Sequence, residues 1–383
     1  MKRNQRNTCD SDKRHVCIEE AAIIDAVQNT GLSFSPILWS ITFATLVVFL
    51  LTLSSCKPNS DEKQKLKALI IDGQSNHGIW PKTTAMMKDY LEQTGLFTVD
   101  VARTARIWQG PHSDNDVNLG KDRREGLLLA YPIAGLPQAA PLEKPEPDPD
   151  FRPVFSNYDV VISNFGWQAA PWPKETQTAL EMFVSGGGGL VVTHAADNSF
   201  GDWEQFNKMI GMGAWGDRDE KTGPYVYFDK SGSLVRDTTA GTAGSHGKQY
   251  SFLITMRDTT HPITKGMPTE WLHVQDELYD RLRGPAQNMD ILATAFSDVA
   301  ANDSPFSDLT GTDRNEPMAM TVAYGNGRVF HTPLGHADYS WEGVGLITMF
   351  QRACEWAATG KVTIPVPSDF PTADSARTRK WAH

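Results

Sequence analysis

Several short apolar runs in this sequence end in polar residues, and this repeated pattern constrains the fold more than any other feature. The apolar runs cover residues 68–71, 160–162, 190–192 and 328–330, and the polar segments after them contain His77, Asn164, His194 and His336. In an open parallel α/β sheet, ligands bind outside the carboxyl ends of the strands. The sequence therefore predicts a sheet of this kind, with these polar side chains around one shared pocket.

The spacing of apolar residues predicts strands and helices in alternation, which is typical of a parallel sheet. The predicted strands are 67–72, 98–101, 159–163 and 190–193, and the predicted helices are 82–94, 174–184 and 202–210. Short alternating runs between residues 225 and 296, and a hairpin over 318–332, predict antiparallel additions. The predicted fold class is thus α/β, with a doubly wound, mostly parallel, flavodoxin-like sheet and an antiparallel extension.

The N-terminal region contains a candidate secretion signal. Residues 36–53 form an apolar run without charge that leads into Leu53-Ser54-Ser55-Cys56. An apolar run closed by small residues is typical of a secretory signal, and Leu-Ser-Ser-Cys resembles a bacterial lipobox, whose cysteine is lipidated and becomes the mature N-terminus. We expect a signal segment over 1–56 and a lipoprotein anchored to the bacterial cell-envelope membrane through Cys56, facing the periplasm or the outside. An uncleaved anchor helix is the alternative, although the run is short for spanning a bilayer.

The remainder divides into a polar tether over 57–66, one domain over 67–360 and a C-terminal tail over 361–383. A proline-rich, acidic insertion at about 106–153 interrupts the pattern of strands and helices. Because proline breaks both helices and central strands, we expect no core element there. The insertion is either a surface feature or an ordered loop near the pocket, and long loops in compact domains often act as lids, which favours the second interpretation.

The net charge and the residue at one bend argue against two classes of function, nucleic-acid binding and cysteine-dependent amidotransfer. The net charge is -10 and no Lys/Arg-rich block is present, which argues against a nucleic-acid partner, because phosphate binding needs clustered cations. Cys9 and Cys17 would leave with the signal and Cys56 would carry lipid, so Cys354 would be the remaining cysteine and is interpreted as a small core residue.

The bend after the strand at 190–193 carries His194 where hydrolases of this architecture carry serine and glutamine amidotransferases carry cysteine. A cysteine-dependent amidotransferase is therefore not expected.

Several short motifs occur together in an order that resembles a known family, the ThuA-like (trehalose utilisation) proteins. They are the Gly-x-x-x-His of 73–77, Tyr-Asp-Val-Val at 158–161, 187–194, His-Pro-Ile at 261–263, Asp-Glu-Leu-Tyr at 276–279, 325–330 and Leu-Gly-His at 334–336. The resemblance spans roughly 67–359 and implies the fold of the class I glutamine amidotransferases. One departure is Gly78, because Asn-His is usually followed by an acidic residue in this family.

The resemblance also implies a role in carbohydrate catabolism, on glycosides or disaccharides oxidised to 3-keto sugars. A 3-keto group acidifies the neighbouring C–H bonds, so a histidine or glutamate could drive isomerisation, elimination or hydrolysis by acid-base chemistry. The chain would then be a sugar isomerase, lyase or hydrolase. The alternative is a non-catalytic lipoprotein of the cell envelope that binds carbohydrate.

Candidate site residues follow from position and chemistry. We expect His194 to be an acid-base catalyst, since its pKa suits proton transfer, and Glu277 to be its partner or a second catalyst; a core role is the alternative for His194. The expected substrate-binding residues are His77, Asn164, Asp197, Asp276, Tyr279, His336 and Trp341. His246, in a glycine-rich loop, could fold over a ligand. No cofactor is predicted, although His77, His194, His336 and Glu277 could together hold a divalent metal ion.

Overall fold

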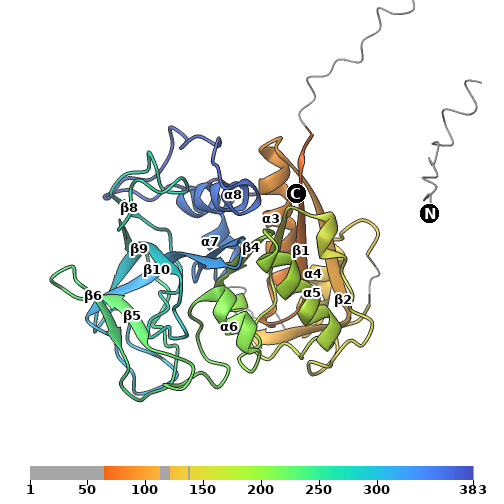
Figure 1. The fold of residues 1–383 in the computed structure, drawn as a ribbon, viewed down its shortest axis with the longest axis horizontal. Coiled ribbons are helices and arrows are strands. Elements are labelled where there is room, and N and C mark those ends of the chain that lie inside the picture. The colour runs from red at the N-terminus through yellow and green to blue at the C-terminus, as the bar shows by residue number, and fades with distance from the viewer. Residues whose placement is uncertain (1–63, 113–120, 137–138, 383) are drawn as a thin grey trace, which may run out of the picture. The chain divides into compact units, whose positions relative to one another are not determined.

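The computed structural model describes residues 64–112, 121–136 and 139–382. Its centre is an 11-stranded sheet with the order β2-β1-β3-β4-β11-β10-β9-β7-β8, to which β5 and β6 attach at β10 (Figure 1). The parallel half consists of β1 (Leu66–His77), β2 (Phe97–His112), β3 (Val160–Ser163), β4 (Gly189–Thr193) and β11 (Gly327–Thr332). The predicted α/β class and the predicted central strands are present.

The other half of the sheet is antiparallel and larger than the sequence predicted. It consists of β5 (Tyr225–Phe228), β6 (Leu234–Asp237), β7 (Leu253–Met256), β8 (Glu270–Leu272), β9 (Met289–Ser297) and β10 (Arg314–Tyr324). The sheet is therefore mixed rather than mostly parallel. The alternating runs predicted between residues 225 and 296 form β5, β7 and β9, and the predicted hairpin over 318–332 forms β10 and β11. The sequence did not predict β6 and β8, which have four and three residues.

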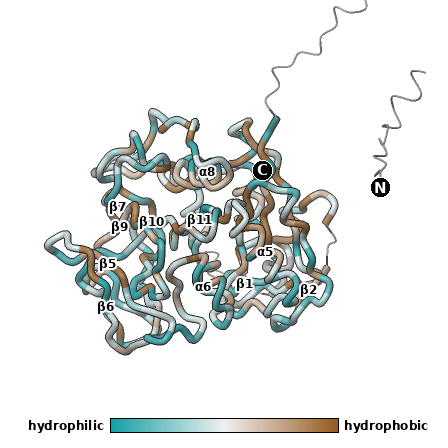
Figure 2. The backbone as a smooth tube through the Cα atoms, viewed as in Figure 1, coloured by the Kyte–Doolittle hydropathy of each residue, from teal (hydrophilic) through white to brown (hydrophobic). Residues whose placement is uncertain are grey.

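Helices pack against both faces of the parallel half. They are α3 (Trp80–Gln93), α4 (Lys121–Ala130), α5 (Lys174–Ser185), α6 (Glu204–Ile210), α7 (Asp338–Trp341) and α8 (Val344–Thr359), with short 3₁₀ turns η1 (Phe155–Asn157) and η2 (His194–Asn198). Alternate residues of β1 point to opposite faces: Ile70 packs in a core with α3 and α8, and Ile71 packs in a core with α5 and α6. Figure 2 shows hydrophobic residues along strands such as β5 and β9.

The proline-rich insertion contributes more to the core than expected. Strand β2 continues into it, and Trp108 pairs with Gln74 beyond a register shift in β1. Ile107 packs with Trp80 and Leu128 in a small buried cluster. The expectation that no core element lies in 106–153 was wrong, because the pairing partner of this stretch is the polar end of β1, which carries no apolar alternation.

The C-terminal tail packs against the domain in the described residues. The backbone N–H of Val344 donates to the carbonyl of Arg377, and the N–H of Arg379 donates to the carbonyl of Glu342. The carboxylate of Glu355 on α8 accepts hydrogen bonds from the backbone of Thr363 and Ile364. The tail is therefore bound to both ends of α8.

The predicted signal segment, with its lipidation site Cys56, lies outside the described residues. Of the helices in the part of the chain that the structure describes, none has the length and apolar character needed to cross a membrane.

Cys354 lies in α8 and is completely buried in the core between that helix and the sheet. Replacing Cys354 by Ala is expected to cost about 1 kcal/mol of stability, because a small apolar side chain is shortened without loss of a hydrogen bond. Activity per folded molecule should not change, since Cys354 does not line the cavity described below. Urea unfolding and turnover of Cys354→Ala check this, and a normally folded but inactive variant would contradict it.

Candidate active site

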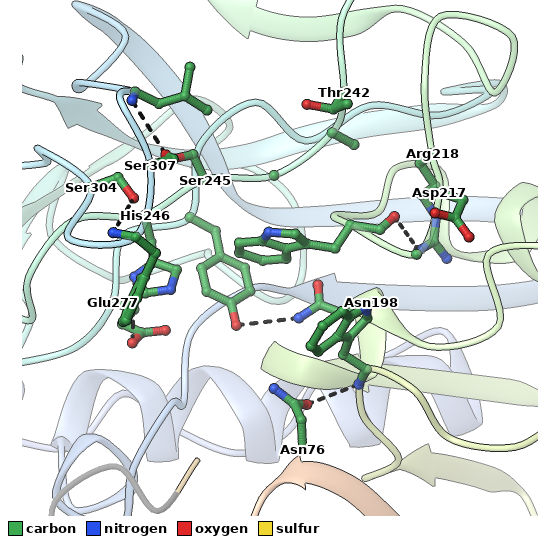
Figure 3. Close-up of a pocket in the computed structure, with 18 of the residues that line it drawn as sticks. Asn76, Asn198, Asp217, Arg218, Thr242, Ser245, His246, Glu277, Ser304 and Ser307 are labelled. Carbon is green, nitrogen blue, oxygen red and sulfur yellow. Dashed lines mark hydrogen bonds and ion pairs between the residues drawn. The ribbon is translucent and has the colours of Figure 1, made fainter. Parts of the chain in front are cut away.

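A cavity of about 910 Å³ opens where the carboxyl ends of the parallel strands meet the loops of the antiparallel half. His77 enters it from the end of β1, and His336 from the segment after β11. Glu277 and Tyr279 come from the segment between β8 and β9. Figure 3 shows His246 beside Glu277 at one end of the cavity and Arg218 at the other. The predicted pocket is therefore present, with one wall from each half of the sheet.

His194 lies under this cavity rather than in its wall. It follows β4 with a φ of 43°, in the left-handed region that is costly for a residue with a side chain and is common at functional turns. Its Nδ1 donates to the carbonyl of Pro333 at 2.8 Å, so the lone pair of its neutral form is on Nε2. The hydroxyl of Tyr279 donates to that nitrogen at 2.8 Å. Burial and the neighbouring His336 and His77 lower the pKa of His194 to about 3, which makes it an acceptor that orients Tyr279.

Glu277 is a buried carboxylate surrounded by imidazoles. Its Oε2 lies 2.8 Å from Nδ1 of His336 and 3.9 Å from Nε2 of His194, and its Oε1 lies 3.5 Å from Nδ1 of His246. Burial alone would raise the pKa of Glu277, but the adjacent histidines, His336 first and then His246, outweigh burial and lower it. The carboxylate is therefore ionised and can accept a proton from a molecule in the cavity.

Three histidine rings meet at the floor of the cavity. The ring centroids are 5.0 Å apart for His77 and His194, 4.7 Å for His77 and His336, and 4.9 Å for His194 and His336. All three side chains are buried, and one nitrogen from each lies within 4.8 Å of the others. His77, His194 and His336 therefore lie close together, as the sequence predicted.

Asp276 faces away from the cavity, although it is the neighbour of Glu277. Its carboxylate is fully buried and accepts hydrogen bonds from Nε2 of His273 at 2.8 Å and from the backbone N–H groups of Gly335 at 2.8 Å, His336 at 3.0 Å and Glu277 at 2.9 Å. Burial favours the neutral acid, but the hydrogen bond and charge of His273 outweigh burial and lower the pKa of Asp276 to about 2. Asp276 therefore positions His336 and Glu277.

Three other expected substrate-binding residues also lie behind the cavity wall. The amide of Asn164 donates to Trp80 and to two threonines of α3, and so ties β3 to that helix. The carboxylate of Asp197 is paired with Nε2 of His331 at 3.0 Å, and burial raises its pKa. The indole of Trp341 donates to the carbonyl of Gly335 at 3.0 Å, and a Cβ on Gly335 would lie 2.9 Å from that indole nitrogen. Asn164, Asp197, Asp276 and Trp341 are not among the residues that line the cavity, so the geometry favours positioning roles for them over the predicted direct contact with substrate.

Five further residues line the cavity together with His246. They are Asn76, Trp167, Asn198, Trp215 and Ser245. Trp215 has a φ of 44° and its ring contacts that of Tyr279 at 4.9 Å. The glycine-rich loop around His246 was one sequence signal for this wall. None of the described residues of the proline-rich insertion lines the cavity, so the lid interpretation gains no support.

Comparisons with known proteins found a family model and several solved structures that are similar to this chain. The family model for ThuA, trehalose utilisation, matches residues 146–357. The solved structure of a ThuA-like protein from Parabacteroides merdae is 37% identical, with a TM-score of 0.68, over 82% of this chain and 98% of its own. A ThuA-like protein from Bacteroides uniformis is 14% identical over 80% of this chain and 96% of its own, with a TM-score of 0.45. No curated protein matches the sequence.

Proposed function

Because the chain belongs to the ThuA (trehalose utilisation) family, which indicates a carbohydrate-related role, we propose that it is a carbohydrate-catabolic enzyme that acts on 3-keto glycosides or disaccharides by proton transfer. The observation that carries this proposal is the pairing of Glu277 with Tyr279 in one cavity wall. The first is an ionised carboxylate among imidazoles, and the second is a phenol oriented by His194. A base and a hydrogen-bond donor two residues apart suit a substrate whose carbonyl lies next to an acidic C–H bond.

Elimination is the reaction that this arrangement supports best. Glu277 removes the proton on C2 of a 3-keto sugar. The single O–H of Tyr279, which donates to Nε2 of His194 in the structure, turns to the carbonyl oxygen and stabilises the negative charge that develops there. The electron pair then forms the C1–C2 double bond as the C1–O bond to the aglycone breaks. His246, with its ring beside Glu277, is placed to give a proton to the departing oxygen. This elimination needs no covalent nucleophile, which agrees with the presence of His194, rather than serine or cysteine, at the turn after β4.

The reaction is tested with purified protein and a chromogenic 3-keto glucoside in D₂O, followed by NMR. We expect exchange of the C2 proton and release of the aglycone, while the corresponding glycoside that was not oxidised stays unchanged. Binding of the keto sugar without C2 exchange would overturn the catalytic proposal and favour the alternative of a carbohydrate-binding protein of the cell envelope.

Trp215 is the aromatic side chain best placed to stack on a sugar ring, because it is partly exposed, lines the cavity and packs against both Tyr279 and His246. Trp215→Ala is expected to weaken keto-sugar binding about 10- to 100-fold, the range for losing a well-packed aromatic anchor. Trp215→Phe should retain most of the affinity. Isothermal titration calorimetry measures the affinity of both variants for the keto sugar. Equal affinity of Trp215→Ala and the wild type would rule out stacking on this residue.

A further inference from the structure

We propose that His77, His194 and His336 bind one divalent transition-metal ion of the zinc, manganese or cobalt class. They form a group of histidine side chains whose nitrogens converge from the ends of β1, β4 and β11. His77 is the last residue of β1, His194 directly follows β4 and His336 lies in the segment after β11, so the sheet brings the three histidines to one edge. Three protein ligands with further positions open to a cavity are typical of a catalytic rather than a structural metal centre.

The tautomer of His194 supports this proposal. Its Nδ1 donates to the carbonyl of Pro333, a group that can only accept, and so Nε2 presents a lone pair toward the other histidines. A metal-binding histidine usually has its second nitrogen held by a carbonyl or carboxylate in this way. The bond to Pro333 therefore orients the ring as a ligand.

The crowding around this lone pair points the same way. Nε2 of His194 lies 2.8 Å from the Tyr279 hydroxyl and 3.0 Å from Nδ1 of His336. One lone pair cannot accept two full hydrogen bonds. Because Nδ1 of His336 donates to Oε2 of Glu277 at 2.8 Å, a metal ion bound by that nitrogen would release its proton to solvent. The two histidine nitrogens would then lie close to the roughly 3.3 Å that separates neighbouring ligands of a tetrahedral site with metal–nitrogen bonds of about 2.0–2.1 Å.

The charge balance also favours a cation. Glu277 is buried beside the cluster, and in the described part of the chain its ion-pair partners are all histidines, without a lysine or arginine. A buried carboxylate needs a compensating positive charge. A divalent ion on the three histidines would supply that charge and leave Glu277 as the neighbouring base. Its chemical role would be to polarise the substrate carbonyl, a role that rests on the proposed function, whereas metal binding does not.

The experiment measures metal binding independently of catalysis. Protein stripped with a chelator is titrated with Zn²⁺, Mn²⁺ and Co²⁺ by calorimetry, and the metal content after dialysis is measured by mass spectrometry. We expect one ion per chain, a raised melting temperature and a visible Co²⁺ absorption band from the histidine ligands. His77→Gln, His194→Gln and His336→Gln should each weaken binding at least about 100-fold, since even outer-shell changes cost 10- to 100-fold.

His261→Ala is the matched control, because His261 lies in a turn where its ring packs on Trp356, outside the cluster. Absence of stoichiometric binding to the wild type, or equal losses in the control and the three cluster variants, would overturn the metal site. Turnover of keto glycosides by metal-free protein would overturn its catalytic role and leave the proposed function intact. Metal binding without any turnover would support the site and count against the proposed reaction.

Discussion

Glu277→Gln is expected to lower turnover of a 3-keto glycoside about 10²- to 10⁴-fold, the usual contribution of a general base. The substitution keeps the shape of the side chain and removes its charge and basicity. Glu277 lies in the cavity wall with its carboxylate 2.8 Å from His336. The substitution therefore removes a proton acceptor without changing the size of the cavity. Substrate affinity should change much less than turnover.

Steady-state kinetics and C2-proton exchange of the Glu277 variant provide the measurement, with circular dichroism as the check of folding. Glu270→Gln is a suitable control, because Glu270 is exposed on β8. Tyr279→Phe should also lose activity, since the phenyl ring cannot donate to the carbonyl oxygen. A folded Glu277→Gln variant with turnover near that of the wild type would remove Glu277 from the mechanism.

Asp276→Ala is expected to cause the largest loss of stability, about 3–5 kcal/mol. The four N–H groups that donate hydrogen bonds to Asp276 would be left without an acceptor in a buried region. Breaking such a buried ionic network is strongly destabilising. The backbone around His336 would also lose its anchor. We therefore expect reduced activity per folded molecule in addition to the loss of stability.

Urea unfolding gives the free energy of unfolding of Asp276→Ala, and Asp290→Ala, an exposed position on β9, is the control. Asp276→Asn should be intermediate, because its amide keeps one oxygen that accepts hydrogen bonds. If Asp276→Ala unfolded at the same urea concentration as the wild type, the positioning role of Asp276 would be wrong.

The parallel half of the fold could be predicted from sequence because its signals are local. The apolar run before His194 forms β4, and the run before His77 starts β1, so the strand ends brought these histidines to one edge of the sheet. The antiparallel half could not be predicted to the same extent. Strand β8 has three residues and pairs with β7, the strand before it, and a strand of three residues is too short to show a period of two.

The roles of neighbouring site residues were beyond sequence reasoning for a different reason. Asp276 and Glu277 are adjacent acidic residues, but one accepts backbone hydrogen bonds behind the wall and the other faces the histidines. Only the backbone conformation determines which of the two carboxylates faces the cavity. Likewise, His194 is at the expected turn, but Tyr279 lies between it and the cavity, a contact across 85 positions of the chain.

The docking of the C-terminal tail has a practical consequence for recombinant work. A polypeptide ended after α8 would keep every cavity residue, but it would leave the Glu355 carboxylate without its hydrogen-bond donors from Thr363 and Ile364. It would also lose Trp381, whose indole N–H donates a hydrogen bond of 3.0 Å to the carboxylate of Asp89 on α3. Expression clones trimmed at the end of α8 should therefore yield poorly soluble material, and affinity tags belong beyond Trp381.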